Sequence, residues 1–262
     1  MWVFPQLSTG ASAVYPVSRN TNLRTVVNTL ADGSAVVYSD PDAAVTEWEL
    51  RAMGLSAGEW GAIDTLFQAV AGRWQTFTFL DPVGNLLADS ELLSAGAWTN
   101  GPLVGLTTGI GDPLGTMRAT RAINGGSTTQ AVAQVLTVPG DFQYCLSVWA
   151  KTIGGSNVTL TASTTGGSSA KTFSLNTVWQ RISLPVNLTQ STTSVTFGAQ
   201  LDAGASVDLF GLQVEAQLAA SAYKKTGTQG GVYADARFAE SGLTVKAQST
   251  DVFDAVIRIV SA

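Results

Sequence analysis

Residues 142–151 read FQYCLSVWAK, a stretch in which apolar and polar side chains alternate. A period of two is typical of a β-strand that has one face in a hydrophobic core. The same period recurs over residues 158–161, 178–184 and 195–201, between turns rich in Gly, Ser and Asn. Several short strands of this kind predict a sandwich of two antiparallel sheets.

The composition changes on both sides of these strands. Residues 86–226 are rich in Thr, Ser and Gly and carry few charged side chains. Residues 1–85 combine helix and strand patterns, and residues 227–262 regain charge. We therefore expect a mainly β protein in which a small β-rich domain, formed by residues 1–85 and 227–262, carries residues 86–226 as an inserted β-sandwich.

One helix is expected in the first segment. Ser56 and Glu59 have the spacing of a capping box, flanked by Leu55 and Trp60 as a hydrophobic staple. The apolar positions that follow at helical spacing are Trp60, Ile63, Leu66, Phe67 and Val70. Gly72 is placed to end the helix in a left-handed conformation.

Strands are expected around this helix. Residues 23–30 and 35–38 are expected to be strands around a turn at residues 31–33, and residues 45–51 form an alternating run. Residues 74–80 follow the helix with aromatic side chains on alternating sides. The first segment is thus expected to be a small sheet, a helix and one more strand.

Charge and residue counts exclude several functions. The net charge is −5, and the 14 Lys and Arg residues form no cluster, which argues against a nucleic-acid ligand. The chain has no histidine, so a Ser-His-Asp triad and imidazole metal sites are excluded. The single cysteine, Cys145, lies in an apolar run and is expected to be buried and unreactive. We expect neither a signal peptide nor a membrane span.

The middle segment resembles the jelly-roll carbohydrate-binding modules found in cellulases, xylanases and phage fibres. The resemblance begins at Asn85-Leu86-Leu87 and reaches Trp98. It continues through residues 142–151 and Trp179-Gln180-Arg181, and ends at residues 209–215. The resemblance implies a jelly-roll insertion, for which the expected ligand is host surface polysaccharide.

The first segment resembles the small tail-tip proteins of long-tailed phages and gene transfer agents, which include distal tail proteins; the matching motifs are Phe4-Pro5, Tyr15-Pro16-Val17-Ser18-Arg19 and residues 77–82. At the end of the middle segment, Gln213-Val214-Glu215 and residues 220–227 resemble an exit motif that recurs in phage tail and fibre proteins. The resemblance implies a homo-oligomer, a hexameric ring between tail tube and tail hub. The expected partners are the tail tube, tail hub and tape-measure proteins. The expected location is the virion tail tip, after synthesis in the host cytoplasm.

Aromatic side chains bind sugars by stacking on the ring face while polar neighbours bond to the hydroxyls. Trp149 is the first candidate, because alternation places it with Ser147 and Lys151 rather than with the apolar set. Trp98, near a Gly/Asn loop, is the second. Trp179 is expected in the core. A strand buried on both faces would also place tryptophan opposite small residues, so a core role stays open for each.

Other candidates concern assembly, metal and catalysis. The aromatic residues expected to be exposed for subunit contacts are Trp2, Phe4, Trp48 and Trp74. If calcium braces the insertion, as in modules of this class, the candidate ligands are Asp89, Asp208 and Glu215. No other cofactor is expected.

A glycosidase would need a carboxylate pair, and the candidates are Asp112, Asp141, Asp202 and Asp208. Their turn-like contexts explain them without catalysis, so we expect no enzyme. The alternative to a tail-ring protein is a carbohydrate-binding host-adhesion protein.

Overall fold

The computed structural model describes residues 1–261, apart from the side chains of residues 41 and 42. The chain divides into two compact units. Unit 1 comprises Met1–Leu7, Ala13–Phe79 and Tyr233–Ala262, and unit 2 comprises Ser8–Ser12 and Leu80–Val232. The expected insertion, residues 86–226, lies inside the segment Leu80–Val232 of unit 2, whereas Ser8–Ser12, expected in the β-rich domain, also belongs to unit 2. No helix in the described residues is long and apolar enough to span a bilayer.

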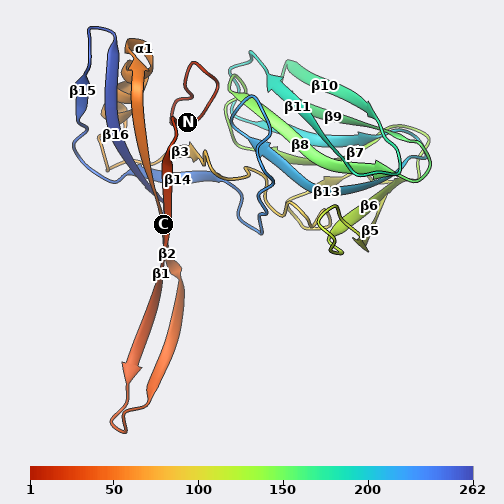
Figure 1. Ribbon diagram of the computed structural model, residues 1–262, viewed down its shortest axis with the longest axis horizontal. Coiled ribbons are helices and arrows are strands. Elements are labelled where there is room, and N and C mark those ends of the chain that lie inside the picture. Colours follow the sequence, from red (N-terminus) through yellow and green to blue (C-terminus); the bar gives the residue numbers. More distant parts are fainter. Residues whose placement is uncertain (262) are drawn as a thin grey trace. The chain divides into compact units, whose positions relative to one another are not determined.

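Unit 1 is a six-stranded sheet with one helix (Figure 1). Its elements are β1 (Val17–Thr29), β2 (Ala35–Ser56), α1 (Ala57–Ala69), β3 (Phe77–Leu80), β14 (Val232–Phe238), β15 (Val245–Ala247) and β16 (Val252–Ser261). The sheet has the order β1-β2-β16-β14-β3, and β15 pairs with β16. The last strand of the chain therefore lies beside a strand from its beginning, with Ile257 opposite Leu50.

The core of unit 1 is aromatic and draws on both ends of the chain. Phe238 packs against Phe67 of α1 and Phe77 of β3, with ring centroids 5.0 and 4.9 Å apart. Trp48 of β2 packs edge-on against Phe79 at 5.0 Å. These contacts and the β2–β16 pairing join the first and last segments in one hydrophobic core.

The helix begins as its capping box predicts. The Ser56 hydroxyl accepts a hydrogen bond from the Glu59 amide at 3.3 Å, and the Glu59 carboxylate accepts one from the Ser56 amide at 2.9 Å. Gly72, with φ +64°, follows the helix end and turns the chain toward β3. The strand after it is shorter than predicted, beginning at Phe77 instead of Trp74.

Unit 2 is a jelly-roll sandwich. Its strands are β4 (Thr99–Asn100), β5 (Val104–Ile110), β6 (Ala119–Asn124), β7 (Gln130–Leu136), β8 (Gln143–Thr152), β9 (Asn157–Thr164), β10 (Gly167–Ser174), β11 (Gln180–Asn187), β12 (Val195–Leu201) and β13 (Ser206–Glu215). One sheet has the order β10-β9-β12-β7-β4 and the other β11-β8-β13-β6-β5. From β6 to β13 the chain crosses between the sheets except at the β9–β10 hairpin. Together with the strand order, this connectivity defines a jelly roll.

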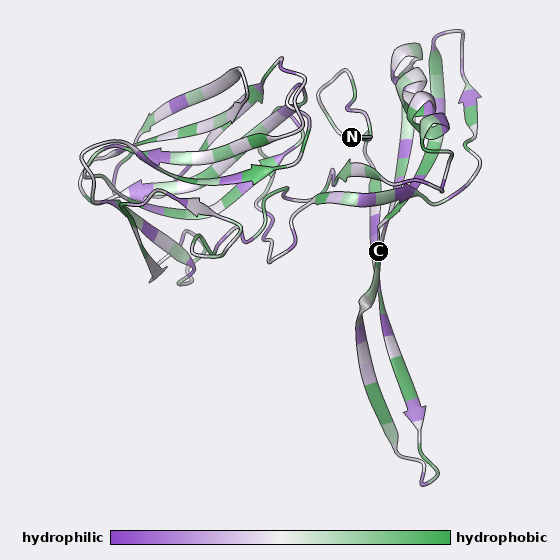
Figure 2. Ribbon diagram, turned by 180° about the vertical axis from the view of Figure 1, so that it is seen from behind, coloured by the Kyte–Doolittle hydropathy of each residue, from purple (hydrophilic) through white to green (hydrophobic). Residues whose placement is uncertain are grey.

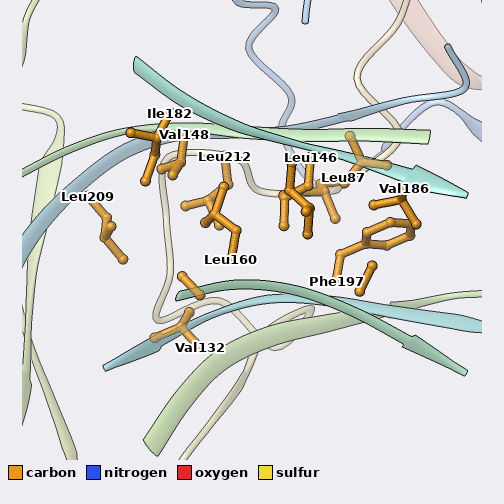
Figure 3. Packing of buried hydrophobic residues seen from close by; sticks show 14 of the residues in the cluster. Leu87, Val132, Leu146, Val148, Leu160, Ile182, Val186, Phe197, Leu209 and Leu212 are labelled. Carbon is orange, nitrogen blue, oxygen red and sulfur yellow. The ribbon is translucent and has the colours of Figure 1, made fainter. Parts of the chain in front are cut away.

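The space between the two sheets is filled by aliphatic side chains and a few aromatic ones (Figure 3). Leu146 and Val148 of β8 point inward from one sheet, and Leu160 and Phe197 point inward from the other. All four are fully buried. The alternate residues of β8 consequently face away from this core, which positions the candidate site.

Candidate functional site

The outer face of the sheet β11-β8-β13-β6-β5 carries the side chains that alternate with the core residues of β8. Trp149 lies opposite Arg181 of β11 on one side and opposite Phe210 of β13 on the other. Lys151 lies opposite Asp208 of β13. The strand register therefore brings aromatic, cationic and acidic side chains together on this face.

Trp149 is half-buried and stands beside a polar group held in place. The Ser147 hydroxyl, on a fully buried residue, accepts a hydrogen bond of 3.1 Å from the Arg181 guanidinium. This bond fixes Arg181 next to Trp149 in the ladder. The predicted grouping of Trp149, Ser147 and Lys151 on one strand face agrees with the structure, while sugar binding by them stays a prediction.

Lys151 links Trp179 to a buried carboxylate. Its ammonium lies 4.8 Å from the centroid of the Trp179 ring, a cation–π geometry, and 3.8 Å from Asp208. Trp179 is half-buried, so the expectation that it belongs to the core is wrong. Trp179 lies directly before β11 and two residues before Arg181, so both side chains point to the outer face of the sheet. This spacing could have been read from the sequence.

Asp208 is almost fully buried and is paired with two cations. The Arg121 guanidinium donates two hydrogen bonds to its carboxylate, at 2.7 and 3.1 Å. These bonds raise the pKa of Arg121 above its ordinary value, although burial acts in the opposite direction. A bidentate pair of this kind holds both groups in a fixed orientation.

The remainder of the face is covered by the chain that follows β13. The Tyr223 ring packs on Phe210 with centroids 5.3 Å apart, and the guanidinium of Arg118 lies over Phe210 at 5.4 Å. Glu215, also buried, pairs with Lys224 at 2.6 Å. Burial raises the pKa of Glu215, but hydrogen bonds from Lys224 and Ser221 outweigh burial and place it below its ordinary value. The part of the face near β8 and β11 keeps Trp149 and Trp179 partly accessible.

Cys145 lies on the covered part of β8 and is fully buried, as predicted. Burial, reinforced by the negative charge of Glu215, raises the pKa of the Cys145 thiol to about 11. The group is therefore a protonated thiol near neutral pH and has little nucleophilic character.

Trp98 does not belong to this face. Its side chain is only 6% exposed, and its indole N–H donates a 3.0 Å hydrogen bond to the backbone carbonyl of Asp89. The expectation that Trp98 stacks on a sugar is therefore wrong, because the ring packs in the sandwich core. The loop context suggested exposure, but the ring belongs to the sandwich core and its indole N–H is bonded to Asp89.

The three candidate calcium ligands do not form a cluster. Asp208 and Glu215 are seven residues apart on one strand, which separates them by about 20 Å. Each is paired with Arg or Lys side chains, as described above. Within residues 1–261, no group of three or more acidic or cysteine side chains is placed to hold a metal ion. The predicted calcium site has no support in this geometry.

The candidate catalytic carboxylates have structural roles or lie in exposed turns. Asp112 accepts hydrogen bonds from the amides of Leu114, Thr116 and Arg118 at 2.8 to 3.2 Å. Burial raises its pKa, but these bonds and one from the Thr116 hydroxyl lower it to about 2. Asp141 and Asp202 are exposed. Asp112 therefore closes a turn, as its sequence context suggested.

The four aromatic candidates for subunit contacts divide into two pairs. Trp2 and Trp74 are 50% and 70% exposed, as expected of contact residues. Phe4 and Trp48 are 5% and 1% exposed, so the expectation that they are surface residues is wrong. Both belong to the core of unit 1, where Phe4 packs edge-on against Phe79 at 5.6 Å.

A long hairpin is the most exposed part of unit 1. The run at residues 45–51, predicted as a separate strand, is part of the 22-residue β2, which pairs with β1. The hairpin extends away from the helix and the other strands of its unit (Figure 1). Apolar residues lie along it (Figure 2), and the largest exposed ones are Leu23, Val27, Leu30, Val37 and Tyr38.

Among the residues that the structure describes, no third strand or second layer of unit 1 covers the outer half of this hairpin. Val27 and Val37 lie opposite each other on one face, and Val26 lies opposite Tyr38 on the other. Val27 and Val37 are 57% and 62% exposed. A two-stranded ribbon with both faces in water is only marginally stable. This surface is therefore suited to contact with another molecule.

Unit 2 thus defines a jelly-roll β-sandwich with an aromatic and cationic outer face. No protein-family model matches the sequence, and no curated protein matches it. Among solved structures, the C-terminal family 22 carbohydrate-binding module of a Clostridium thermocellum xylanase shares 18% identity, with a TM-score of 0.42. That match covers 53% of this chain and 99% of the module.

Two further solved structures are similar over about half of this chain. TmCBM61, solved in complex with beta-1,4-galactotriose, shares 14% identity with a TM-score of 0.40, covering 50% of this chain and 97% of that one. The enzymatically active domain of tailspike protein 4 from bacteriophage CBA120 shares 12% identity with a TM-score of 0.41. This match covers 52% of this chain and 22% of the tailspike chain. The jelly-roll assignment itself comes from the strand order.

Proposed function

We propose that this protein is a structural component of a phage tail tip, similar to a distal tail protein. Unit 1 assembles copies of the chain into a closed hexameric ring that links tail tube and tail hub. Unit 2 contacts glycans on the host surface. The observation that carries the assembly role is the β1–β2 hairpin, whose outer half exposes apolar side chains on both faces.

The physical argument is one of burial. Val27, Val37 and Tyr38 are each more than half exposed, on a ribbon that no layer within the described part of the chain covers. A neighbouring copy that receives this hairpin removes the apolar surface from water and gives each chain one donor and one acceptor surface. Contacts of this heterologous kind form a closed ring when the rotation that relates neighbouring copies closes. Exposed Trp2 and Trp74 extend the apolar surface of unit 1.

The resemblance of residues 1–85 to tail-tip proteins supports the identity of the partners. These are further copies of the chain and the tail tube, tail hub and tape-measure proteins, with the virion tail tip as location. We propose a binding and assembly role without catalysis. Its support is the lack of histidine and the structural role of Asp112 and Asp208 described above.

Sedimentation velocity tests the assembly role. The wild-type chain of 27.2 kDa is expected to sediment as a closed oligomer of six copies. The double substitution Val27→Glu and Val37→Glu places two charges on one hairpin face and is expected to yield monomers. The matched control is Val135→Glu with Val178→Glu, which changes two comparably exposed valines of unit 2. A wild-type monomer at high concentration, or a hairpin variant that assembles as well as the control, would contradict the proposal.

A second candidate function is favoured by the outer face of unit 2. A carbohydrate-binding host-adhesion protein would use Trp149, with Ser147 and Lys151 beside it, and unit 1 would serve only as an anchor. Under this alternative, Trp149→Ala abolishes attachment to host cells while hairpin substitutions leave attachment unchanged. If attachment requires the hairpin as well, the ring role is favoured.

A further inference from the structure

We propose that the glycan bound by unit 2 is acidic, with carboxylate groups that contact Lys151 and Arg181 beside the rings of Trp149 and Trp179. This inference rests on the proposed glycan-binding function and adds the chemical class of the ligand. The evidence is the balance of charge on the outer face of the sheet β11-β8-β13-β6-β5.

The accessible part of this face has an excess of positive charge. Its cations are Arg121, Lys151 and Arg181, and its only described carboxylate partner is Asp208. Asp208 accepts two hydrogen bonds from Arg121, at 2.7 and 3.1 Å, and lies farther, at 3.8 Å, from Lys151. The excess stands out on a chain whose net charge is −5.

Arg181 is the cation with the most unused capacity. Its guanidinium donates to the neutral Ser147 hydroxyl, and no ion pair to Arg181 occurs in the part of the chain that the structure describes. A guanidinium has further N–H donors in a planar fork that matches a carboxylate. Arg181 is held next to Trp149 by the strand register, so a sugar stacked on that ring would present its substituents to Arg181.

Lys151 is held in place before a ligand arrives. Its ammonium is fixed between the Trp179 ring, at 4.8 Å, and Asp208. It is a diagonal neighbour of Arg181 across the β8–β11 ladder, so the two cations flank the aromatic pair. Little side-chain entropy is lost when such a preorganised group binds an anion.

The neighbouring covered region has a different balance. There the cations Arg118, Lys224 and Lys225 are paired with Glu91, Asp112 and Glu215. Three positive charges meet three negative ones, which is the pattern of a structural network. The unbalanced cations therefore occur on the part of the face that also exposes tryptophan, and that combination favours an acidic polysaccharide over a neutral one.

Binding of oligogalacturonate, a carboxylate-bearing oligosaccharide, to the full chain tests the inference by titration calorimetry. Neutral xylo-oligosaccharide of equal length and single-stranded DNA serve as comparison ligands. Oligogalacturonate is expected to bind best, and raising the salt from about 0.05 M to about 0.5 M is expected to weaken its binding about tenfold. Lys151→Gln and Arg181→Gln are each expected to weaken binding about fivefold.

The matched control is Lys171→Gln, because Lys171 on the other sheet also lies over an aromatic ring, Phe173, at 5.0 Å. The Lys171→Gln variant is expected to bind oligogalacturonate as tightly as wild type. Lys151→Arg keeps the positive charge and is expected to bind as wild type, which would show that Lys151→Gln weakens binding through loss of charge and not through misfolding. Neutral xylo-oligosaccharide bound as tightly, without salt dependence, would overturn the acidic class and leave glycan binding intact. No binding of either glycan would overturn both. Equal binding of DNA, lost in the same variants, would overturn the polysaccharide assignment.

Discussion

Gly211 illustrates how a single residue shapes the covered part of the site. Its φ of +65° lies in the left-handed region, and a Cβ there would come within 2.9 Å of the Tyr223 ring. Glycine therefore permits both the bulge in β13, between Phe210 and Gln213, and the close packing of Tyr223. The bulge shifts the strand register just beside Trp149.

Gly211→Ala is expected to lower the free energy of unfolding by about 1 to 3 kcal/mol, because it adds both backbone strain and a clash. Gly204→Ala is the matched control, since Gly204 has a φ of +70° and open space around its Cβ position. That variant is expected to lose about 1 kcal/mol from strain alone. Urea unfolding measures both values. Equal losses would show that the contact with Tyr223 contributes nothing.

Asp112 is expected to make the stability of unit 2 depend on pH. Its pKa is lowered from 3.8 to about 2 in the folded state, so its ionised form is stabilised by folding. This contribution is complete above about pH 4 and is lost as the pH falls toward 2. Asp112→Asn is expected to lower stability at neutral pH by about 1 to 2 kcal/mol. The difference from wild type should then shrink in acid, whereas Asp141→Asn, at an exposed position, should differ little from wild type at neutral pH.

At the scale of elements, local signals in the sequence were reliable where few residues decide the structure. The capping box at Ser56 and Glu59 fixed the start of α1, and alternation fixed which residues of β8 face outward. Exposure was harder to predict, because it depends on segments distant in sequence. Trp48 packs against Phe79 of β3 and against Tyr233, and Trp98 packs in the core of the sandwich.

The α1 cap provides a prediction at this scale. Ser56→Ala removes the hydroxyl that accepts from the Glu59 amide and is expected to cost about 1 kcal/mol of stability. Ser56→Thr keeps a hydroxyl and is expected to retain most of that stability. Thermal unfolding of both variants checks this. A loss in Ser56→Thr as large as in Ser56→Ala would assign the effect to packing instead of capping.

At the scale of the whole molecule, the change in composition along the sequence predicted two units. It also predicted that the first unit is formed by two segments, one before and one after the second unit. The boundaries between the units lie a few residues from the predicted ones, at residues 79/80 and 232/233. They fall within β3 and β14 because these two strands are neighbours in the sheet of unit 1. The length of the β1–β2 hairpin could not be predicted, since its strands pair across a bulge that has no distinct pattern in the sequence.

The neighbouring positions of β3 and β14 allow a direct test of the claim that unit 1 is the assembling body. Residues 80–232 can be replaced by a short Gly-Ser linker between residues 79 and 233, and the product imaged by electron microscopy beside the full chain. We expect closed rings of six copies from both proteins. A folded full-length protein that remains monomeric, or a folded shortened chain that fails to form rings while the full chain forms them, would contradict this claim.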